Sequence, residues 1–162
     1  DAEDALAPGT SDFEFGAEFR RDDISTGDPT DNGDNLVQRG LFGNGAQYKI
    51  DIDKQSPSCR VEGADGVLQV RGSALVAANT WYSARCSRIG TEVELTVMEY
   101  VDSRWVQHSV DKQSGATGKI SWEDSELPFS VGGKLTRVGD VVGRASDQFN
   151  GAIANPYLVI RQ

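Results

Sequence analysis

Two carboxylates stand at alternate positions of an apolar run, Asp51 and Asp53 in the segment 49–53 (KIDID). Alternate side chains of a β-strand point to one face and are about 6.5–7 Å apart along the strand. A retaining glycosidase holds its nucleophile and its acid about 5–5.5 Å apart, so such a pair could do acid–base chemistry. The same spacing describes any solvated strand face, which is the interpretation we favour. Asp51 and Asp53 remain the weaker, catalytic alternative.

His108 is the single histidine of the chain. A nucleophilic triad needs it beside an activated serine and an acid, and the sequence lacks a Gly-x-Ser-x-Gly turn to present that serine. We therefore expect a partly exposed strand histidine. One histidine and two distant cysteines also cannot supply the four ligands of a structural zinc ion. The sequence predicts no catalytic residue and no zinc.

Oxygen ligands are densest in the segment 28–34 (DPTDNGD), within a Gly- and Asn-rich stretch that we expect to be a long surface loop. Calcium takes about six to eight oxygen ligands, which such a loop can provide, although the acids do not have EF-hand spacing. Two interpretations stay open: a structural calcium ion, or a wide loop whose carboxylates are solvated. The ligands expected for calcium are Asp28, Asp31, Asp34 and Asp147. No other cofactor is expected.

Aromatic side chains offer a further kind of site, because their faces stack on sugar rings while polar neighbours bind the hydroxyls. Trp122 stands between polar residues and is the ring that we expect to be exposed. Trp81, at the start of a strand, is expected in the core. Lys49 and Asp51 are the polar residues that we expect beside a ligand, with Trp122 as its aromatic contact.

The net charge of −9 is concentrated near the N-terminus, since residues 1–34 hold eleven of the 25 acidic residues and two of the 16 basic ones. The remaining residues are balanced and contain no Lys/Arg-rich stripe, so a nucleic-acid partner is not expected. No stretch approaches the roughly 20 apolar residues of a membrane-spanning helix, so we expect no transmembrane segment.

The chain has two cysteines, Cys59 and Cys86, both in strand-like segments and 27 residues apart. A disulfide joining them across neighbouring strands would stabilise the fold by about 3.5 kcal/mol in the chain-entropy model. The sequence starts at Asp1, as a secreted protein does after its signal peptide is removed, or as a trimmed chain does. We expect a secreted, disulfide-bonded protein; the alternative is a cytosolic one with two reduced thiols.

Strand-like segments recur along the chain at short spacing, separated by Gly-, Asn- and Asp-rich turns. In the first of them Phe13, Phe15 and Phe19 alternate with polar residues, which predicts a strand with one buried face. No twelve-residue window has helical periodicity. About ten short strands predict one all-β domain, a sandwich or a barrel, over residues 12–162 after a flexible leader of residues 1–11. The remaining segments are 35–39, 47–53, 59–62, 67–71, 81–88, 93–100, 105–110, 129–133, 149–153 and 157–160, the last two separated by Pro156.

Five segments in order resemble the laminin-G-like branch of the concanavalin A-like lectin/glucanase superfamily, in particular its secreted actinobacterial members. They are 34–40 (DNLVQRG), 47–50 (QYKI), 81–82 (WY) leading to 93–97 (VELTV), 129–134 (FSVGGK) and 147–153 (DQFNGAI). The resemblance covers residues 12–161 and implies a jelly-roll sandwich of two curved antiparallel sheets. Where the family closes on an acid after Phe149, Gly151 and Ile153, this chain has Ala154, so what that acid orders in relatives is in doubt here.

The resemblance is specific for the fold and not for the function; the function that we favour is a non-catalytic binding module for an extracellular glycan. Glucanases of the superfamily carry three carboxylates at alternate strand positions, and here Lys49 replaces the first of them beside Asp51 and Asp53. An enzyme is therefore not expected, and a glycan hydrolase with this reduced carboxylate pair is one alternative. The other is a protein-adhesion or assembly module that binds no sugar, since the fold alone does not decide the function.

Overall fold

The computed structural model of the 162-residue chain describes residues 4–22, 34–123, 127–142 and 147–161. Ten β-strands and no helix lie within these ranges. The strands are β1 (Phe13–Arg21), β2 (Asp34–Arg39), β3 (Gln47–Asp53), β4 (Ser56–Gly63), β5 (Gly66–Arg71), β6 (Trp81–Ile89), β7 (Glu92–Val101), β8 (Arg104–Ser114), β9 (Phe129–Val131) and β10 (Gly151–Ile160). Within the described ranges, no helix is long and apolar enough to cross a membrane.

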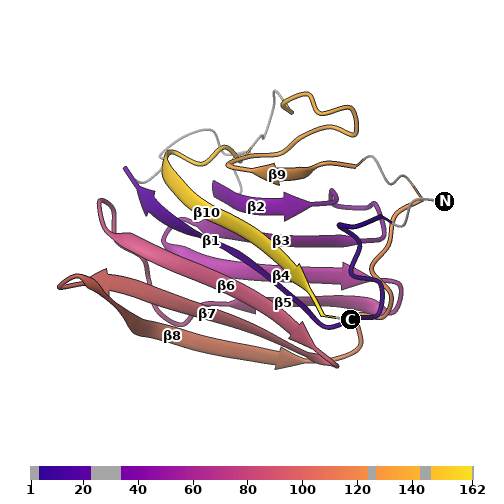
Figure 1. Cartoon of the computed structure of the whole chain (residues 1–162), viewed down its shortest axis with the longest axis horizontal. Coiled ribbons are helices and arrows are strands. Elements are labelled where there is room, and N and C mark those ends of the chain that lie inside the picture. The colour runs from indigo at the N-terminus through magenta and orange to yellow at the C-terminus, as the bar shows by residue number, and fades with distance from the viewer. Residues whose placement is uncertain (1–3, 23–33, 124–126, 143–146, 162) are drawn as a thin grey trace.

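The strands form two antiparallel five-stranded sheets that pack face to face, which confirms the predicted all-β sandwich. One sheet has the order β10-β1-β6-β7-β8 and lies nearer the viewer in Figure 1. The other has the order β5-β4-β3-β2-β9 and lies behind it. Hairpins such as β6–β7 and β7–β8 join neighbouring strands, so their registers are set by tight turns.

The core lies between the two sheets and is built from the inward side chains of alternating strands. Phe13 and Phe15 of β1 are buried and pack against Tyr48 of β3, with ring centroids 5.6 and 5.0 Å from the Tyr48 ring. Phe19 packs against Tyr82 of β6 in the same layer. The predicted alternation in β1 is therefore confirmed.

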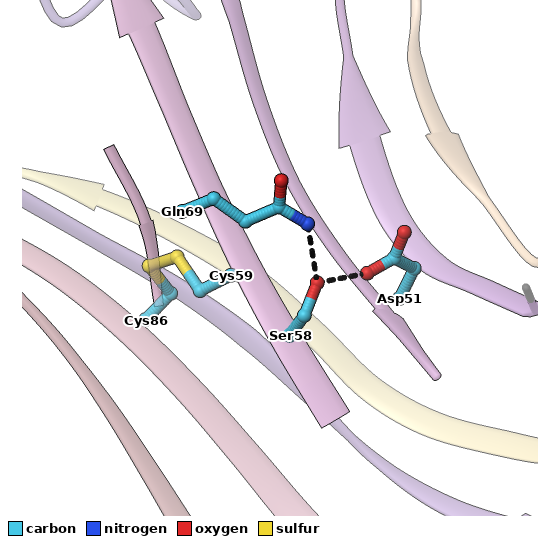
Figure 2. The surroundings of a disulfide bond; sticks show 5 residues. All are labelled: Asp51, Ser58, Cys59, Gln69 and Cys86. Atoms are coloured by element: carbon cyan, nitrogen blue, oxygen red, sulfur yellow. Dashed lines mark hydrogen bonds between the residues drawn. A yellow bond between two sulfur atoms is a disulfide. The ribbon is translucent and has the colours of Figure 1, made fainter. Parts of the chain in front are cut away.

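The disulfide joins the two sheets rather than neighbouring strands of one sheet. Cys59 lies in β4 and Cys86 in β6, and both side chains point into the core (Figure 2), with their Cα atoms 6.0 Å apart. The predicted pairing is confirmed, but the expected bridge between adjacent strands is wrong. Alternation explains the difference, because a cysteine on the inward face of one sheet meets an inward residue of the opposite sheet.

The last strand is continuous, although Pro156 was expected to divide it in two. β10 is an edge strand, where a missing N–H can be tolerated. Its pairing with β1 shifts between Gly16–Tyr157 and Glu18–Ala154, so two residues of β10 stand opposite one of β1. This β-bulge holds Asn155, with φ of 50°, and Pro156. The bulge absorbs the proline without ending the strand.

Residues 4–11, expected to be part of a flexible leader, pack against one end of the sandwich. Gly9 and Ile120 exchange two backbone hydrogen bonds, and the Tyr48 hydroxyl donates to the Leu6 carbonyl at 3.0 Å. The fully buried Arg39 donates to both carboxylate oxygens of Asp4, at 2.9 and 2.8 Å. Over the described residues this segment is part of the folded domain.

Candidate functional site

Three aromatic side chains lie on consecutive strands of the first sheet: Trp81 begins β6, Tyr100 is near the end of β7, and Trp105 is near the start of β8. Tyr100 and Trp105 are cross-strand partners with ring centroids 5.1 Å apart. The β6–β7 register pairs Tyr82 with Glu99, so Trp81 stands opposite Tyr100. We call Trp81, Tyr100 and Trp105 the aromatic row; it crosses the left end of the sheet in Figure 1.

The aromatic row belongs to the outer face of the sheet. In β6 the inward positions are Tyr82, Ala84 and Cys86, all buried, so Trp81 points the other way. Tyr100 is 43% exposed and Trp105 37% exposed. Trp81 is half-buried, and the guanidinium carbon of Arg20 on the neighbouring strand lies 5.8 Å from its ring centroid. A cation over the ring face favours this orientation of Trp81.

Three polar side chains and one methionine form the next rank on the same face, which we call the polar rank. Glu18, Ser83, Met98 and Gln107 follow one another across β1, β6, β7 and β8. Gln107 is exposed, and Glu18 accepts a hydrogen bond from Asn155 at 3.1 Å. Carboxylate, hydroxyl and amide groups therefore flank the aromatic row, and together they can both donate and accept hydrogen bonds.

Beyond this rank, ion pairs run across the sheet in a ladder. Arg161 contacts Glu14 at 2.9 Å, and Arg85 lies between Glu14 at 3.9 Å and Glu94 at 3.0 Å. Lys112 continues the ladder, 3.0 Å from Glu94 and 2.9 Å from Glu92. The hydrogen bond from Lys112 is the largest influence that lowers the pKa of Glu94, and burial opposes it. We call these six residues the charge ladder.

Tyr157 fills the space between the polar rank and the charge ladder. Its ring lies over Gly16, where a Cβ would be 3.1 Å from both the Oη and Cε1 atoms of Tyr157. Burial raises the pKa of the Tyr157 hydroxyl. A glycine at position 16 leaves room for this ring and for the Ala84 carbonyl oxygen, which would lie 2.3 Å from a Cβ.

The predicted carboxylate pair lies on the outer face of the other sheet and is engaged in local contacts. Asp51 is buried and accepts hydrogen bonds from Lys49 and from the Ser58 hydroxyl (Figure 2), which also accepts one from Gln69. Asp53 pairs with Arg71 at 3.4 Å. These contacts hold Asp51 as a structural group and fit the favoured, non-catalytic interpretation.

Trp122, the ring expected to be exposed, is half-buried. Its Nε1 donates to the Ala46 carbonyl at 2.9 Å, its edge meets Tyr48, and the Arg39 guanidinium carbon lies 4.4 Å from its ring centroid. The expectation of exposure is wrong. The polar residues beside Trp122 in the sequence do not reveal that Arg39, Ala46 and Tyr48, from a distant part of the chain, contact its ring. Tyr48 is an inward residue of β3, so Trp122 and the Lys49–Asp51 pair lie on different sides of that sheet.

Trp81 was expected in the core and faces outward instead. A usable signal was present, since Trp81, Ser83 and Arg85 share one alternation phase and the last two are polar. Tyr100 and Trp105 also flank a short turn, which predicts a cross-strand pair. Applying the strand phase before assigning the tryptophans would have found the aromatic row.

Two of the four expected calcium ligands, Asp28 and Asp31, lie outside the described residues. Asp34 is buried and pairs with Arg21 at 3.2 Å, and Asp147 is buried and pairs with Lys134. The backbone N–H of Asn35 donates to the backbone carbonyl of Asp147 at 2.9 Å, so the structure brings these two segments together. Over the described part of the chain, no group of three or more His, Cys, Asp and Glu side chains is placed to hold a metal. Calcium stays a prediction.

His108 is partly exposed on β8, as expected. Its Nδ1 lies 3.2 Å from the Glu99 carboxylate and its Nε2 lies 2.9 Å from the Leu75 carbonyl oxygen. Its ring meets the edge of Tyr82. These contacts link His108 of β8 to β6, to β7 and to the segment after β5, which is a structural role.

Comparison with known proteins identifies the fold. No family model and no curated protein matches the sequence. Among solved structures, the LG1-3 region of the laminin alpha2 chain matches with a TM-score of 0.67 and 10% identity, over 92% of this chain and 27% of that one. Domains LG4-5 of the mouse laminin alpha1 chain match with a TM-score of 0.61 and 18% identity, over 93% of this chain and 36% of that one. The chain has the laminin-G-like, concanavalin A-like sandwich fold and spans about a third of the structures that it matches.

Proposed function

We propose that this chain is a non-catalytic, extracellular binding module that recognises a glycan through the aromatic row. The observation that carries the proposal is the alignment of Trp81, Tyr100 and Trp105 on three consecutive strands, with Tyr100 and Trp105 well exposed. Aromatic faces stack on the apolar side of a sugar ring, and a few polar groups beside them fix its hydroxyls. Ser83 and Gln107 in the adjacent rank are placed to do so.

The state of the candidate catalytic groups supports a binding module over a hydrolase. Asp51 is bound by Lys49 and Ser58, and Asp53 is paired with Arg71. The disulfide supports an extracellular place, because such bonds persist in oxidising compartments.

The proposal is tested by glycan-array binding followed by titration of the best oligosaccharide. Trp105→Ala and Tyr100→Ala should each weaken binding about tenfold or more, since each removes about 1.5 kcal/mol of stacking. Val110→Ala is the matched control, because Val110 is exposed on the same face of β8 outside the aromatic row. Circular dichroism confirms that the variants fold. Binding that both aromatic variants retain would place the site elsewhere, and loss on adding a chelator would support the calcium loop.

A protein ligand is the second candidate. Val101 and Val106, 39% and 41% exposed, neighbour Tyr100 and Trp105 in the β7–β8 hairpin and by alternation point to its other face, so both faces of this hairpin expose apolar side chains. Exposed apolar patches of this kind mark protein contacts as well as ligand sites. Two results together would favour the adhesion module. The glycan array would give no signal, and a protein ligand would bind the unmodified chain but not Trp105→Ala.

A further inference from the structure

The charges around the aromatic row restrict the class of glycan. Resting on the proposed function, we infer that the row takes an uncharged glycan chain lying across the strands, and that it rejects sulfated or uronic-acid-rich chains. The inference has two parts, the direction of the ligand and its charge.

The direction follows from the strand spacing. Trp81, Tyr100 and Trp105 lie on neighbouring strands at matching register, so the row runs perpendicular to the strands. With about 4.8 Å between strands, three rings extend over about 10 Å. Two consecutive sugar units can contact this length at once. Arg20, over the Trp81 ring on the next strand, bounds the row on that side.

The charge follows from the partners of the basic residues on this face. Arg20, the base nearest the row, pairs with Asp22 at 3.3 Å. In the charge ladder, Arg85 and Lys112 each contact two carboxylates, and Arg161 contacts Glu14. A sulfate group would have to compete with these carboxylates for every guanidinium or ammonium group. Each of these four bases has at least one carboxylate partner.

The field of the whole face is also unfavourable to anions. The ion pairs and the polar rank together contain four bases, Arg20, Arg85, Lys112 and Arg161, and five acids, Glu14, Glu18, Asp22, Glu92 and Glu94. The chain as a whole carries a net charge of −9. Long-range repulsion therefore slows the approach of a polyanion, and Glu18, for which the described residues provide no ion pair, repels it after contact.

The test compares neutral oligosaccharides with sulfated ones by isothermal titration calorimetry. The probes are cellohexaose, xylohexaose and mannohexaose on one side, and heparin and chondroitin sulfate on the other. We expect at least one neutral probe to bind, with a Kd that changes less than about twofold between about 0.01 and 1 M salt. Its affinity should rise from the monosaccharide to the di- or trisaccharide and then level off, because the row is only about 10 Å long.

Variants link each result to the aromatic row. Trp105→Ala should weaken binding of the neutral probe about tenfold or more. Asp22→Asn, which removes the carboxylate partner of Arg20, should leave that binding within about threefold while allowing measurable heparin binding at low salt. Glu92→Gln, a single acid removed at the far side of the charge ladder, is the control and should not admit heparin.

The outcomes separate this inference from the proposed function. Salt-sensitive binding of heparin to the unmodified chain, lost in Trp105→Ala, would overturn the inference while the glycan-binding function stands. Absence of binding to every probe would overturn the proposed function itself, and the inference with it. Neutral binding that keeps strengthening up to the hexasaccharide would overturn the predicted ligand direction.

Discussion

Arg39 is a buried base that pairs with a carboxylate from a distant segment, Asp4. Its side chain is fully buried and makes a two-pronged contact with Asp4, whose side chain is 15% exposed. Removing one partner of a buried ion pair destabilises a fold by about 3–5 kcal/mol. We expect Asp4→Asn to lower the free energy of unfolding by an amount near the low end of this range, measured by urea denaturation.

The matched control is Asp22→Asn, which removes a carboxylate from the exposed pair with Arg20. Exposed pairs contribute about 0–1 kcal/mol, so this variant should unfold within that margin of the unmodified chain. Equal effects of the two substitutions would contradict the structural role assigned to Asp4 and to the docking of residues 4–11.

Single residues also mark the limit of prediction from sequence. Alternation identified Phe13, Phe15 and Phe19 as core residues because that signal lies within one strand. The burial of Arg39 depends on Asp4, Leu127 and Trp122, which come from segments far apart in the chain. No local pattern brings such segments together, so the burial of Arg39 and the partial burial of Trp122 required the structure.

At the scale of the sheet, the charge ladder makes stability depend on pH through Glu94. Its pKa is lowered chiefly by the hydrogen bond from Lys112. A carboxyl whose folded pKa is depressed stabilises the fold above its unfolded value of about 4.3 and loses that contribution as pH falls through the folded value. We expect Glu94→Gln to destabilise the chain by about 1 kcal/mol or less near pH 7, and by a vanishing amount near about pH 2.

Glu92→Gln is the control for this prediction. Glu92 contacts Lys112 alone within the ladder and its side chain is 45% exposed, against 19% for Glu94. Its effect on the urea midpoint should be smaller at every pH. A difference between Glu94→Gln and the unmodified chain that stays constant from neutral to acid pH would rule out the ladder as its source.

The sequence predicted strands well where a tight turn joins neighbouring strands, and poorly where a strand pairs with one that is distant in the sequence. The Gly90 turn and the turn between Val101 and Arg104 set the registers of β6, β7 and β8, and both are visible in the sequence. The break expected at Pro156 was wrong because two features that tolerate the proline cannot be read from the local sequence. These are the edge position of β10 and the bulge opposite Ala17, and both depend on pairing with β1, at the other end of the chain.

For the whole molecule, the Cys59–Cys86 bond ties one sheet to the other. Closing a loop of 27 residues restricts the unfolded chain and stabilises the fold by about 3.5 kcal/mol in the chain-entropy model. We expect Cys59→Ala/Cys86→Ala to lower the free energy of unfolding by about that amount, measured by denaturation. The unmodified chain should weigh two hydrogens less than its reduced form. Two free thiols, or unchanged stability of the double variant, would refute the bond or its role.

The aromatic row and the two described ends of the chain lie at opposite ends of the sandwich (Figure 1). Asp4 and Ile160 line the same cavity, so the two ends lie close together. The row lies where β6 and β8 begin and β7 ends, which is at the left of Figure 1, whereas the N and C labels are at the right. An affinity tag, a fluorophore or a sensor-chip anchor attached through either terminus would therefore leave the row facing the bulk solution. The protein can be displayed on a surface as an oriented probe, with the aromatic row directed outward.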